Sequence, residues 1–584
     1  MYTILENARI TIALLKKHNI RHIVLSPGGS NIPIVQGVQQ DPFFKCYSVV
    51  DERSAMYFAI GLYLKTGEVI ATSCTSAQAT RNYIPGLTEA FYKRVPVLAI
   101  TMSKHPRYLL QDYMQCPIQT SLPVDAVKAS YSIPIINSDH DRALCVRTVN
   151  EAILELTHNG NGPVQLNIEE LDNETWCLDS KVSLPDVRAI QRICYNDMYK
   201  ESLGNKKILI VIGEHRPFAC RQIEAIESFC NNTNTFVYSD LVSNYHGKYS
   251  LNVNARVMNM QQNMFDAKYS PDILITIGGI TGDYGIFNLL QNSKIKEHWR
   301  IDVDGKVVDT YNRLTRIYQM EIEDFFNNII DFSSDSNHSY YDMWKSLHNG
   351  TVYDVEIPFS NLYAAQVLYK HIPENSTMHF AILNSLRAWS NFILPNSIEC
   401  YSNVAAFGID GCLSTMIGSS IENEHLTFLI TGDLSFYYDM NALGIRHIKN
   451  NVRILLVNNN GGAEFKLSDL ETRTDVSSYI SAANHFKNAK GWSETSGFKY
   501  LSANNKETFC SQIETFLSAS DQPVILEIFT KAMDERVANG IMRDANFIGN
   551  TINQLKKNIK SGIKDVVGVS TVDKIKRVLN DNKK

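Results

Sequence analysis

Short apolar runs alternate with stretches of helical apolar spacing along most of the 584 residues. Strands that are buried on both faces of a sheet are apolar throughout, and helices connect such strands when they run parallel. The alternation therefore predicts a parallel α/β architecture. In the first third of the chain, strands are predicted at 21–25, 46–50, 69–74 and 95–101, with helices at 52–64 and 82–92.

Two further groups of apolar runs follow, and polar stretches separate the groups. Their strands are predicted at 207–213, 272–277 and 299–303, and then at 377–383, 425–431, 452–457 and 523–529. A chain of this length exceeds what one hydrophobic core fills. We therefore predict three parallel-sheet α/β domains at residues 1–180, 195–345 and 355–532, followed by a C-terminal helical extension at 533–584.

The C-terminal extension is richer in lysine and arginine than in acidic residues. Its segment INQLKKNIKSGIKDVV has the spacing of an amphipathic helix with a basic face. Such a pattern usually marks a solvated helix face. A lid, an oligomer contact and a partner-binding helix are the alternatives.

The composition narrows the class of protein. A net charge of -5 and a pI near 6.3 give no drive toward nucleic acid or a membrane surface. The eleven cysteines form no C-x-x-C pairs, so neither a zinc site nor a disulfide framework is indicated. The N-terminal residues lack the pattern of a secretory signal, and no apolar run approaches the roughly 20 residues of a membrane helix. We expect a cytoplasmic protein that binds no nucleic acid and spans no membrane.

The stretch from Ile430 to Phe465 carries the most chemistry. An apolar strand ends at Gly432-Asp433, a helical pattern with Met440, Leu443 and Ile448 follows, and a second strand ends in NNNGG. Parallel strands of such a unit open toward one edge of a sheet, where ligands bind. A carboxylate, amide oxygens and a Gly-rich backbone suit Mg²⁺ shared with phosphate oxygens. A helix that begins after Gly432 would add N–H groups and a favourable dipole for a diphosphate.

Each piece alone could be an ordinary turn. Together they resemble the fingerprint of the thiamine-diphosphate-dependent enzymes, in which Gly-Asp precedes Asn-Asn by a span of about 25–30 residues. The resemblance implies thiamine diphosphate and Mg²⁺ as cofactors, with Asp433, Asn459 and the carbonyl of Gly461 as metal ligands. Asn460 is the alternative to Asn459, because three asparagines in a row leave the register open by one.

A second element resembles the same family. In VVDERSAMYFAIG a strand ends at Asp51-Glu52 and a helix follows. By itself this acid could be a helix cap or a first-turn acid. In the family, a glutamate at this place bonds the aminopyrimidine ring of the cofactor and promotes its deprotonation, so Glu52 is the implied catalytic residue. The flanking segments LSPGGSNIPI and TSCTSAQATRNYIPG also resemble the family's first domain.

The resemblance is strongest to the 2-succinyl-5-enolpyruvyl-6-hydroxy-3-cyclohexene-1-carboxylate (SEPHCHC) synthases of the menaquinone pathway and extends to about residue 530. It rests on DERSAMYFAIG, on NSL at 384–386, on YSNVAAFGIDGCLST and on GDLSFYYDMNAL with NNNGG. It implies pyrimidine-binding, central and diphosphate-binding domains, and active sites at the interface of a homodimer or homotetramer. The implied cofactor contacts are Ser385, Ile409, Gly432, Asp433, Leu434, Ser435, Asn459, Asn460 and Gly461.

The substrate side departs from this family. Its carboxylate-rich substrates, 2-oxoglutarate and isochorismate, call for arginines, which pair bidentately with carboxylates. Here Ser30, Val404 and Trp389 stand at arginine positions, and an Asn-Gln pair reads Met114-Gln115. Each missing arginine would leave a buried substrate carboxylate without a partner, at a cost of about 3–5 kcal/mol. Changed substrates are therefore expected, with candidate contacts at Ser30, Gln115 and Arg387.

These observations predict an enzyme that decarboxylates a 2-oxo acid and transfers the resulting acyl-anion equivalent to an acceptor. A simple 2-oxo acid decarboxylase and an acetolactate-synthase-like enzyme are the alternatives within the family. Outside it, the chain could be an inactive regulatory or structural homologue. A flavin- or nucleotide-binding module is a further alternative, but its support is weak, because GGITGDYG lacks the G-x-G-x-x-G fingerprint.

Overall fold

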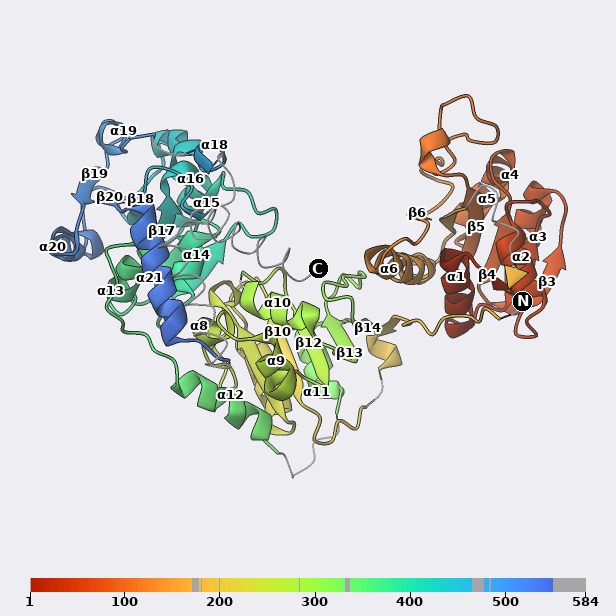
Figure 1. The fold of residues 1–584 in the computed structure, drawn as a ribbon, viewed down its shortest axis with the longest axis horizontal. Helices are drawn as coiled ribbons and strands as arrows, with labels where there is room; N and C mark the ends of the chain where they lie inside the picture. Colours follow the sequence, from red (N-terminus) through yellow and green to blue (C-terminus); the bar gives the residue numbers. More distant parts are fainter. Residues whose placement is uncertain are drawn as a thin grey trace, which may run out of the picture. The chain divides into compact units, whose positions relative to one another are not determined.

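A computed structural model describes residues 2–170, 178–179, 181–198, 200–282, 284–330, 337–464, 477–482 and 485–549. It contains three six-stranded parallel sheets with flanking helices, as predicted (Figure 1). Within the described ranges, no helix combines the length and apolar character that crossing a membrane requires.

The first sheet has the strand order β3-β2-β4-β5-β7-β6. Alternate strand residues pack on opposite faces, since Ile23 and Leu25 join one core cluster and Val24 joins another. Both faces are thus covered, as expected for a parallel sheet. Its strands are β2 (His22–Leu25), β3 (Lys45–Ser48), β4 (Ile70–Cys74), β5 (Val97–Ser103), β6 (Ala129–Ile133) and β7 (Val164–Glu169). Its helices are α1 (Glu6–Lys17), α2 (Ile32–Gln39), α3 (Glu52–Thr66), α4 (Gln78–Asn82), α5 (Ile84–Lys93), η1 (Pro106–Tyr108) and α6 (Asp139–Glu155), and β1 (Tyr2–Thr3) pairs with β8 (Leu178–Asp179).

The second sheet has the order β11-β10-β12-β13-β14-β9. Its strands are β9 (Gln191–Cys194), β10 (Ile208–Ile212), β11 (Thr235–Ser239), β12 (Ile273–Ile277), β13 (Glu297–Ile301) and β14 (Leu314–Gln319). The helical elements of this region are η2 (Tyr195–Asp197), α7 (Cys220–Asn231), η3 (Leu241–Ser243), α8 (Asn254–Val257), α9 (Gln262–Met264), η4 (Phe265–Tyr269), α10 (Tyr284–Asn292), α11 (Ile322–Asn328) and α12 (Ser339–Asn349).

The third sheet has the order β16-β15-β17-β18-β20-β19 and holds the Gly-Asp and Asn-Gly-Gly turns. Its strands are β15 (Thr377–Phe380), β16 (Glu399–Ser402), β17 (Thr427–Gly432), β18 (Val452–Asn458), β19 (Lys499–Ala503) and β20 (Val524–Phe529). Its helices are α13 (Asn361–Leu368), α14 (Asn384–Trp389), α15 (Cys412–Ser420), α16 (Asp433–Tyr438), η5 (Met440–Gly444), α18 (Ser477–Ile480), α19 (Lys490–Thr495), α20 (Lys506–Leu517) and α21 (Ala532–Ala545).

The start of the predicted C-terminal extension is helix α21, which lies beside α13 (Figure 1). Ala538 and Met542 of α21 belong to the core of the third sheet. This helix is therefore part of the fold of that sheet. The basic segment that follows, residues 550–584, lies outside the described residues.

The helix predicted between the Gly-Asp turn and β18 is shorter than expected. Helix α16 has six residues, the 3-10 helix η5 holds Met440 and Leu443, and Ile448 lies beyond both. A dipole that grows with aligned peptide groups is correspondingly weaker here. A helix does begin directly after Gly432, as predicted, but the expected helical pattern through Ile448 is divided between α16 and η5.

Candidate active site

Glu52 is the first residue of α3, but a different residue caps that helix. The side chain of Asp51 accepts the N–H of Arg53 at 3.0 Å and the hydroxyl of Ser54 at 3.2 Å. The half-buried carboxylate of Glu52 instead accepts a hydrogen bond from Nδ2 of Asn82 at 3.0 Å. Because Asp51 fills the capping role, the carboxylate of Glu52 remains available to a ligand.

Two buried groups lie within electrostatic range of Glu52. Burial, with a smaller contribution from the charge of Glu52, raises the pKa of Cys74 to about 12. Burial is also the largest cause of the raised pKa of Tyr83, and the Glu52 charge again contributes. Both side chains are therefore uncharged at pH 7, and Glu52 has apolar and neutral polar neighbours on this side.

Ser30 lies in the turn after β2 and is bound to the turn after β4. Its hydroxyl lies 2.5 Å from Oγ1 of Thr75 and accepts the N–H of Ser76 at 3.2 Å. A Cβ on Gly28 would lie 2.3 Å from Cβ of Thr75, so the close approach of these turns requires glycine. The hydroxyl of Ser30 therefore contributes to the scaffold at the carboxyl edge of the first sheet.

Gln115 lies in the exposed segment between β5 and β6 and has a positive φ of 59°. Its neighbour Met114 is 82 % exposed. A glutamine four residues later takes the buried position: Gln119 accepts the N–H of Ala77 at 2.9 Å and donates to Oδ1 of Asn167 at 2.7 Å. Sequence reasoning selected Gln115 and missed Gln119, since nothing in the spacing of the two glutamines distinguishes them.

Asp433 follows β17 directly, and its side chain is buried. Its Oδ2 accepts the N–H of Asn459 at 3.1 Å and the N–H of Gly461 at 3.0 Å, and it lies 3.0 Å from Nε2 of His485. Its Oδ1 accepts the N–H of Leu434 at 2.7 Å. The structure therefore brings the Gly-Asp turn and the Asn-Gly-Gly turn together through backbone donors that converge on one carboxylate.

The three consecutive asparagines have different environments. Asn458 is buried and donates through Nδ2 to the carbonyl of Lys487 at 2.8 Å and to Oε1 of Glu527 at 2.7 Å. Asn460 has a positive φ of 63° and turns the chain. Among the described residues, the buried Oδ1 of Asn459 has no hydrogen-bond partner. A buried oxygen of this kind fits a metal ligand, and this favours Asn459 over Asn460.

The turns around Gly432 leave room for a ligand. No atom of the described chain lies within 4 Å of the position that a Cβ on Gly432 would occupy. The hydroxyl of Ser435 donates to the carbonyl of Ile409 and lies 3.0 Å from Sγ of Cys412, which joins the GIDG turn to the first turn of α16. Ile409 and Ser435, both predicted to contact the cofactor, are thus joined directly, and the Cβ side of the nearby Gly432 is unobstructed.

Ser385 and Arg387 both lie on α14, which follows a strained residue, Leu383, with a φ of 67°. Ser385 is buried, whereas Arg387 reaches an acid: its Nη2 lies 2.9 Å from Oε1 of Glu464, just after the Asn-Gly-Gly turn. The guanidinium also stacks 5.5 Å from the ring of Tyr284. The cation predicted to read a substrate carboxylate is therefore already paired.

Two of the residues that the resemblance places at arginine positions, Val404 and Trp389, are core residues. Val404 is 0 % exposed and belongs to the core of the third sheet. Trp389 is equally buried and packs 5.9 Å from the ring of Phe380. Neither side chain could be exchanged for a charged one without repacking this core.

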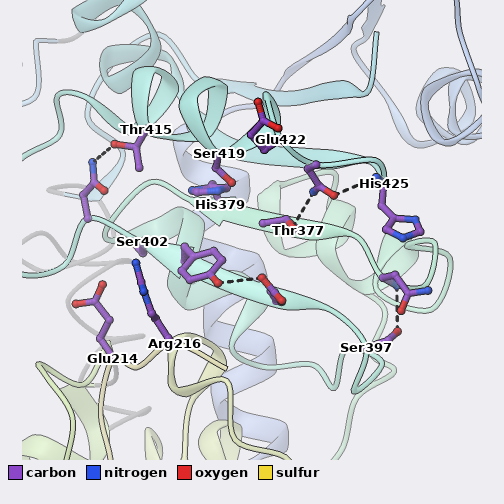
Figure 2. A pocket seen from close by; sticks show the side chains of 15 residues that line it. Glu214, Arg216, Thr377, His379, Ser397, Ser402, Thr415, Ser419, Glu422 and His425 are labelled. Atoms are coloured by element: carbon purple, nitrogen blue, oxygen red, sulfur yellow. Dashed lines mark hydrogen bonds between the residues drawn. The ribbon is translucent and has the colours of Figure 1, made fainter. Parts of the chain in front are cut away.

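A polar pocket of about 610 Å³ lies on the edge of the third sheet and does not include Asp433 or Asn459. Figure 2 shows Glu214 and Arg216 at one end of it and His425 toward the other. Burial lowers the pKa of His379, in its wall, to about 4, so this imidazole is neutral at pH 7. The two turns that meet at Asp433 are therefore not part of the lining of this pocket.

Comparisons with known proteins identify the family of the chain. The model of the thiamine pyrophosphate enzyme N-terminal TPP binding domain matches residues 6–122. The curated SEPHCHC synthase of Bacteroides thetaiotaomicron is 34% identical over 557 residues, which cover 92% of this chain and 98% of the relative. That of Phocaeicola vulgatus is 34% identical and covers 91% and 96% respectively, and that of Bacteroides fragilis is 33% identical. The chain belongs to the thiamine-diphosphate-dependent enzymes of the SEPHCHC synthase family.

Proposed function

We propose that the chain uses thiamine diphosphate and Mg²⁺ to decarboxylate a 2-oxo acid and to transfer the resulting acyl-anion equivalent to an acceptor that carries fewer carboxylates than isochorismate. One observation supports the catalytic part above all. Asp51 caps α3, so the carboxylate of Glu52 at the same helix start is not needed as the helix cap. The family places its acid–base glutamate at this position.

In this proposal Glu52 holds and moves a proton at the aminopyrimidine ring, and Asn82 orients its carboxylate. Asp433, Oδ1 of Asn459 and the carbonyl of Gly461 would hold the metal. Gly432, Leu434, Ser435 and Asn460 would line the diphosphate side, with Ser385 near the diphosphate or the substrate and Ile409 beneath the cofactor. When bound, thiamine diphosphate supplies the nucleophilic carbon and stabilises the negative charge that CO₂ leaves behind.

The substrate proposal rests on charge. A carboxylate needs a free cation or several donors when it is desolvated. Ser30 and Val404 supply no cation at the places where the family has arginine, and Glu464 neutralises Arg387. Tyr284 and Phe407 form an edge-to-face pair 5.7 Å apart beside that arginine. Aldehydes, keto-sugars and 2-oxo acids without further carboxylates suit this lining as acceptors.

We further propose a homodimer or homotetramer with active sites at the subunit interface. Glu52 and Asp433 belong to different compact units, and the family joins these two elements across subunits. The open face of α3 is apolar, with Tyr57, Phe58 and Leu64 all exposed. Gly61 on α3 has no atom of the described chain within 4 Å of its Cβ position, which leaves space for a helix of a second copy. The cytoplasmic location expected from the sequence stays a prediction.

The central sheet offers little support for a dinucleotide module. The turns after β10 and β12 pack backbone to backbone, because a Cβ on Gly213 would lie 2.1 Å from the carbonyl oxygen of Gly279. These glycines permit close packing of two turns. An open phosphate cradle would instead leave free N–H groups at this point.

The test is a CO₂-release screen over 2-oxo acids with thiamine diphosphate and Mg²⁺, comparing wild type with Glu52→Gln. Glu507→Gln is the matched control, because Glu507 is also a first-turn acid, on the exposed start of α20. We expect release from at least one acid, loss of that release in Glu52→Gln and retention in Glu507→Gln. If cofactor-loaded wild type releases CO₂ from none of the acids, the chain is an inactive homologue and the proposal is wrong. Efficient use of 2-oxoglutarate with isochorismate would refute the changed substrates alone.

A further inference from the structure

His485 lies beside Asp433 although it comes from a segment 52 residues further along the chain. Its Nε2 is 3.0 Å from Oδ2 of Asp433, and its Nδ1 is 3.0 Å from the backbone nitrogen of Lys487. The imidazole also packs edge-on against the ring of Tyr437, 5.4 Å away. Three contacts therefore fix the position of this ring next to the predicted metal ligand.

The contacts also define which nitrogen carries the proton. A backbone N–H can only donate, so Nδ1 of His485 accepts from Lys487 and carries no hydrogen. The hydrogen of the neutral imidazole is then on Nε2, which donates to Oδ2 of Asp433. Asp433 thus receives a side-chain donor in addition to its backbone donors.

These donors are unevenly divided between the two carboxylate oxygens of Asp433. Oδ2 accepts from the N–H groups of Asn459 and Gly461 and from His485, whereas Oδ1 accepts from the N–H of Leu434. An oxygen with three donors has little capacity left for a cation, while Oδ1 retains lone-pair density. The carboxylate is also buried, and its hydrogen bonds restrict its rotation.

We propose that His485 is a positioning residue of the metal–diphosphate site: its Nε2–H holds Oδ2 of Asp433 against the Asn-Gly-Gly turn and leaves Oδ1 to the cation. This rests on the proposed function, in which Asp433 is a metal ligand. Hydrogen-bond partners of metal-ligating groups commonly change metal affinity by about 10- to 100-fold when they are removed.

Two amide substitutions separate this role from a merely structural one. The amide of Gln reaches about as far as Nε2, so His485→Gln can restore a donor to Asp433. The amide of Asn reaches only as far as Nδ1, so His485→Asn can keep the bond to Lys487 but loses the donor. His447→Asn is the matched control, because His447 is exposed and, within the described chain, its Nε2 bonds Arg446 and not Asp433.

The experiment strips the purified protein with a chelator and titrates Mg²⁺ at saturating thiamine diphosphate, following the melting temperature and the heat of binding. We expect His485→Asn to weaken Mg²⁺ about 10- to 100-fold, and His485→Gln and His447→Asn to remain near wild type. The melting temperatures without ligand should be similar, which excludes misfolding as the cause.

Two results would overturn the inference in distinguishable ways. If wild type binds Mg²⁺ and His485→Asn binds it equally well, or if Gln is as damaging as Asn, His485 does not position Asp433. If wild type shows no Mg²⁺-dependent binding of thiamine diphosphate, the metal site itself is wrong, and the role of His485 falls with it.

Discussion

The carboxylate of Glu535 on α21 accepts the backbone N–H of Asn361 at 2.8 Å and is completely buried. The hydroxyl of Thr530 donates to the same oxygen at 2.9 Å. Asn361 in turn donates to the carbonyl of Asn384 at 3.1 Å. A buried acid thus joins the last described helix to the turn that presents Ser385.

This acid makes the stability depend on pH. Burial, partly offset by these hydrogen bonds, raises the pKa of Glu535 from 4.5 to about 7. The folded state then binds a proton on Glu535 more tightly than the unfolded state does. The resulting contribution to the free energy of unfolding is fully present below pH 4.5 and is lost as the pH rises through about 7. The shift corresponds to about 3 kcal/mol. We expect the melting temperature of wild type to fall relative to that of Glu535→Gln between pH 5 and pH 8.

The measurement is thermal denaturation of both proteins across that range, and the quantity of interest is the difference between the two curves. Other titrating groups are common to both proteins and cancel. Parallel curves would show that the Glu535 carboxyl has the same pKa in the folded and unfolded states.

Substitution of each of the three consecutive asparagines should have a different effect on stability and on Mg²⁺ binding. Asn458→Ala removes bonds to the buried Glu527 and to the carbonyl of Lys487, so it should lower the unfolding free energy by about 1–3 kcal/mol. Asn459→Ala should weaken Mg²⁺ binding with little change in the melting temperature, because Oδ1 has no partner among the described residues. Asn460→Gly should preserve both, since glycine accepts a positive φ. Calorimetric Mg²⁺ titration and thermal denaturation distinguish these effects, and Mg²⁺ loss in Asn460→Gly instead would move the register by one.

The parallel sheets could be predicted from the sequence because their inner strands are apolar throughout, as in β18. The edge strands β6 and β19 are only partly buried and escaped prediction, and so did the inner strand β7, because its buried residues include Gln165, Asn167 and Glu169. The sequence could propose Glu52 but could not decide between Asp51 and Glu52 as the cap, since both are acids at a strand end. The contact of His485 with Asp433 could not be predicted from the sequence, because it depends on the path of the intervening chain and follows no local period.

The proposed subunit interface can be tested at Gly61. Replacing this helical glycine with Glu has no steric cost within the described chain and should improve helix propensity by about 1 kcal/mol, yet it would place a charge where a second copy packs. We expect Gly61→Glu to remain folded and to elute as a monomer of 66.0 kDa in light-scattering chromatography, while wild type elutes as a dimer or tetramer. Gly491→Glu on α19, which is equally unobstructed, should leave the assembly intact. An unchanged mass for Gly61→Glu would exclude α3 from the interface.

The pairing of Arg387 with Glu464 should limit the use of substrates that carry an additional carboxylate. Glu464→Gln removes the competing acid 2.9 Å from the guanidinium while the stack on Tyr284 can remain. Because the pair is partly exposed, its strength is at most about 1 kcal/mol, so kcat/KM for 2-oxoglutarate should rise by up to about fivefold. The value for a 2-oxo acid with a neutral side chain, such as 2-oxobutyrate, should stay constant or fall. Steady-state rates for both acids test this, with Glu356→Gln as the control, because Glu356 forms an exposed pair with Lys506. An equal change for the two acids would mean that Arg387 does not contact the substrate.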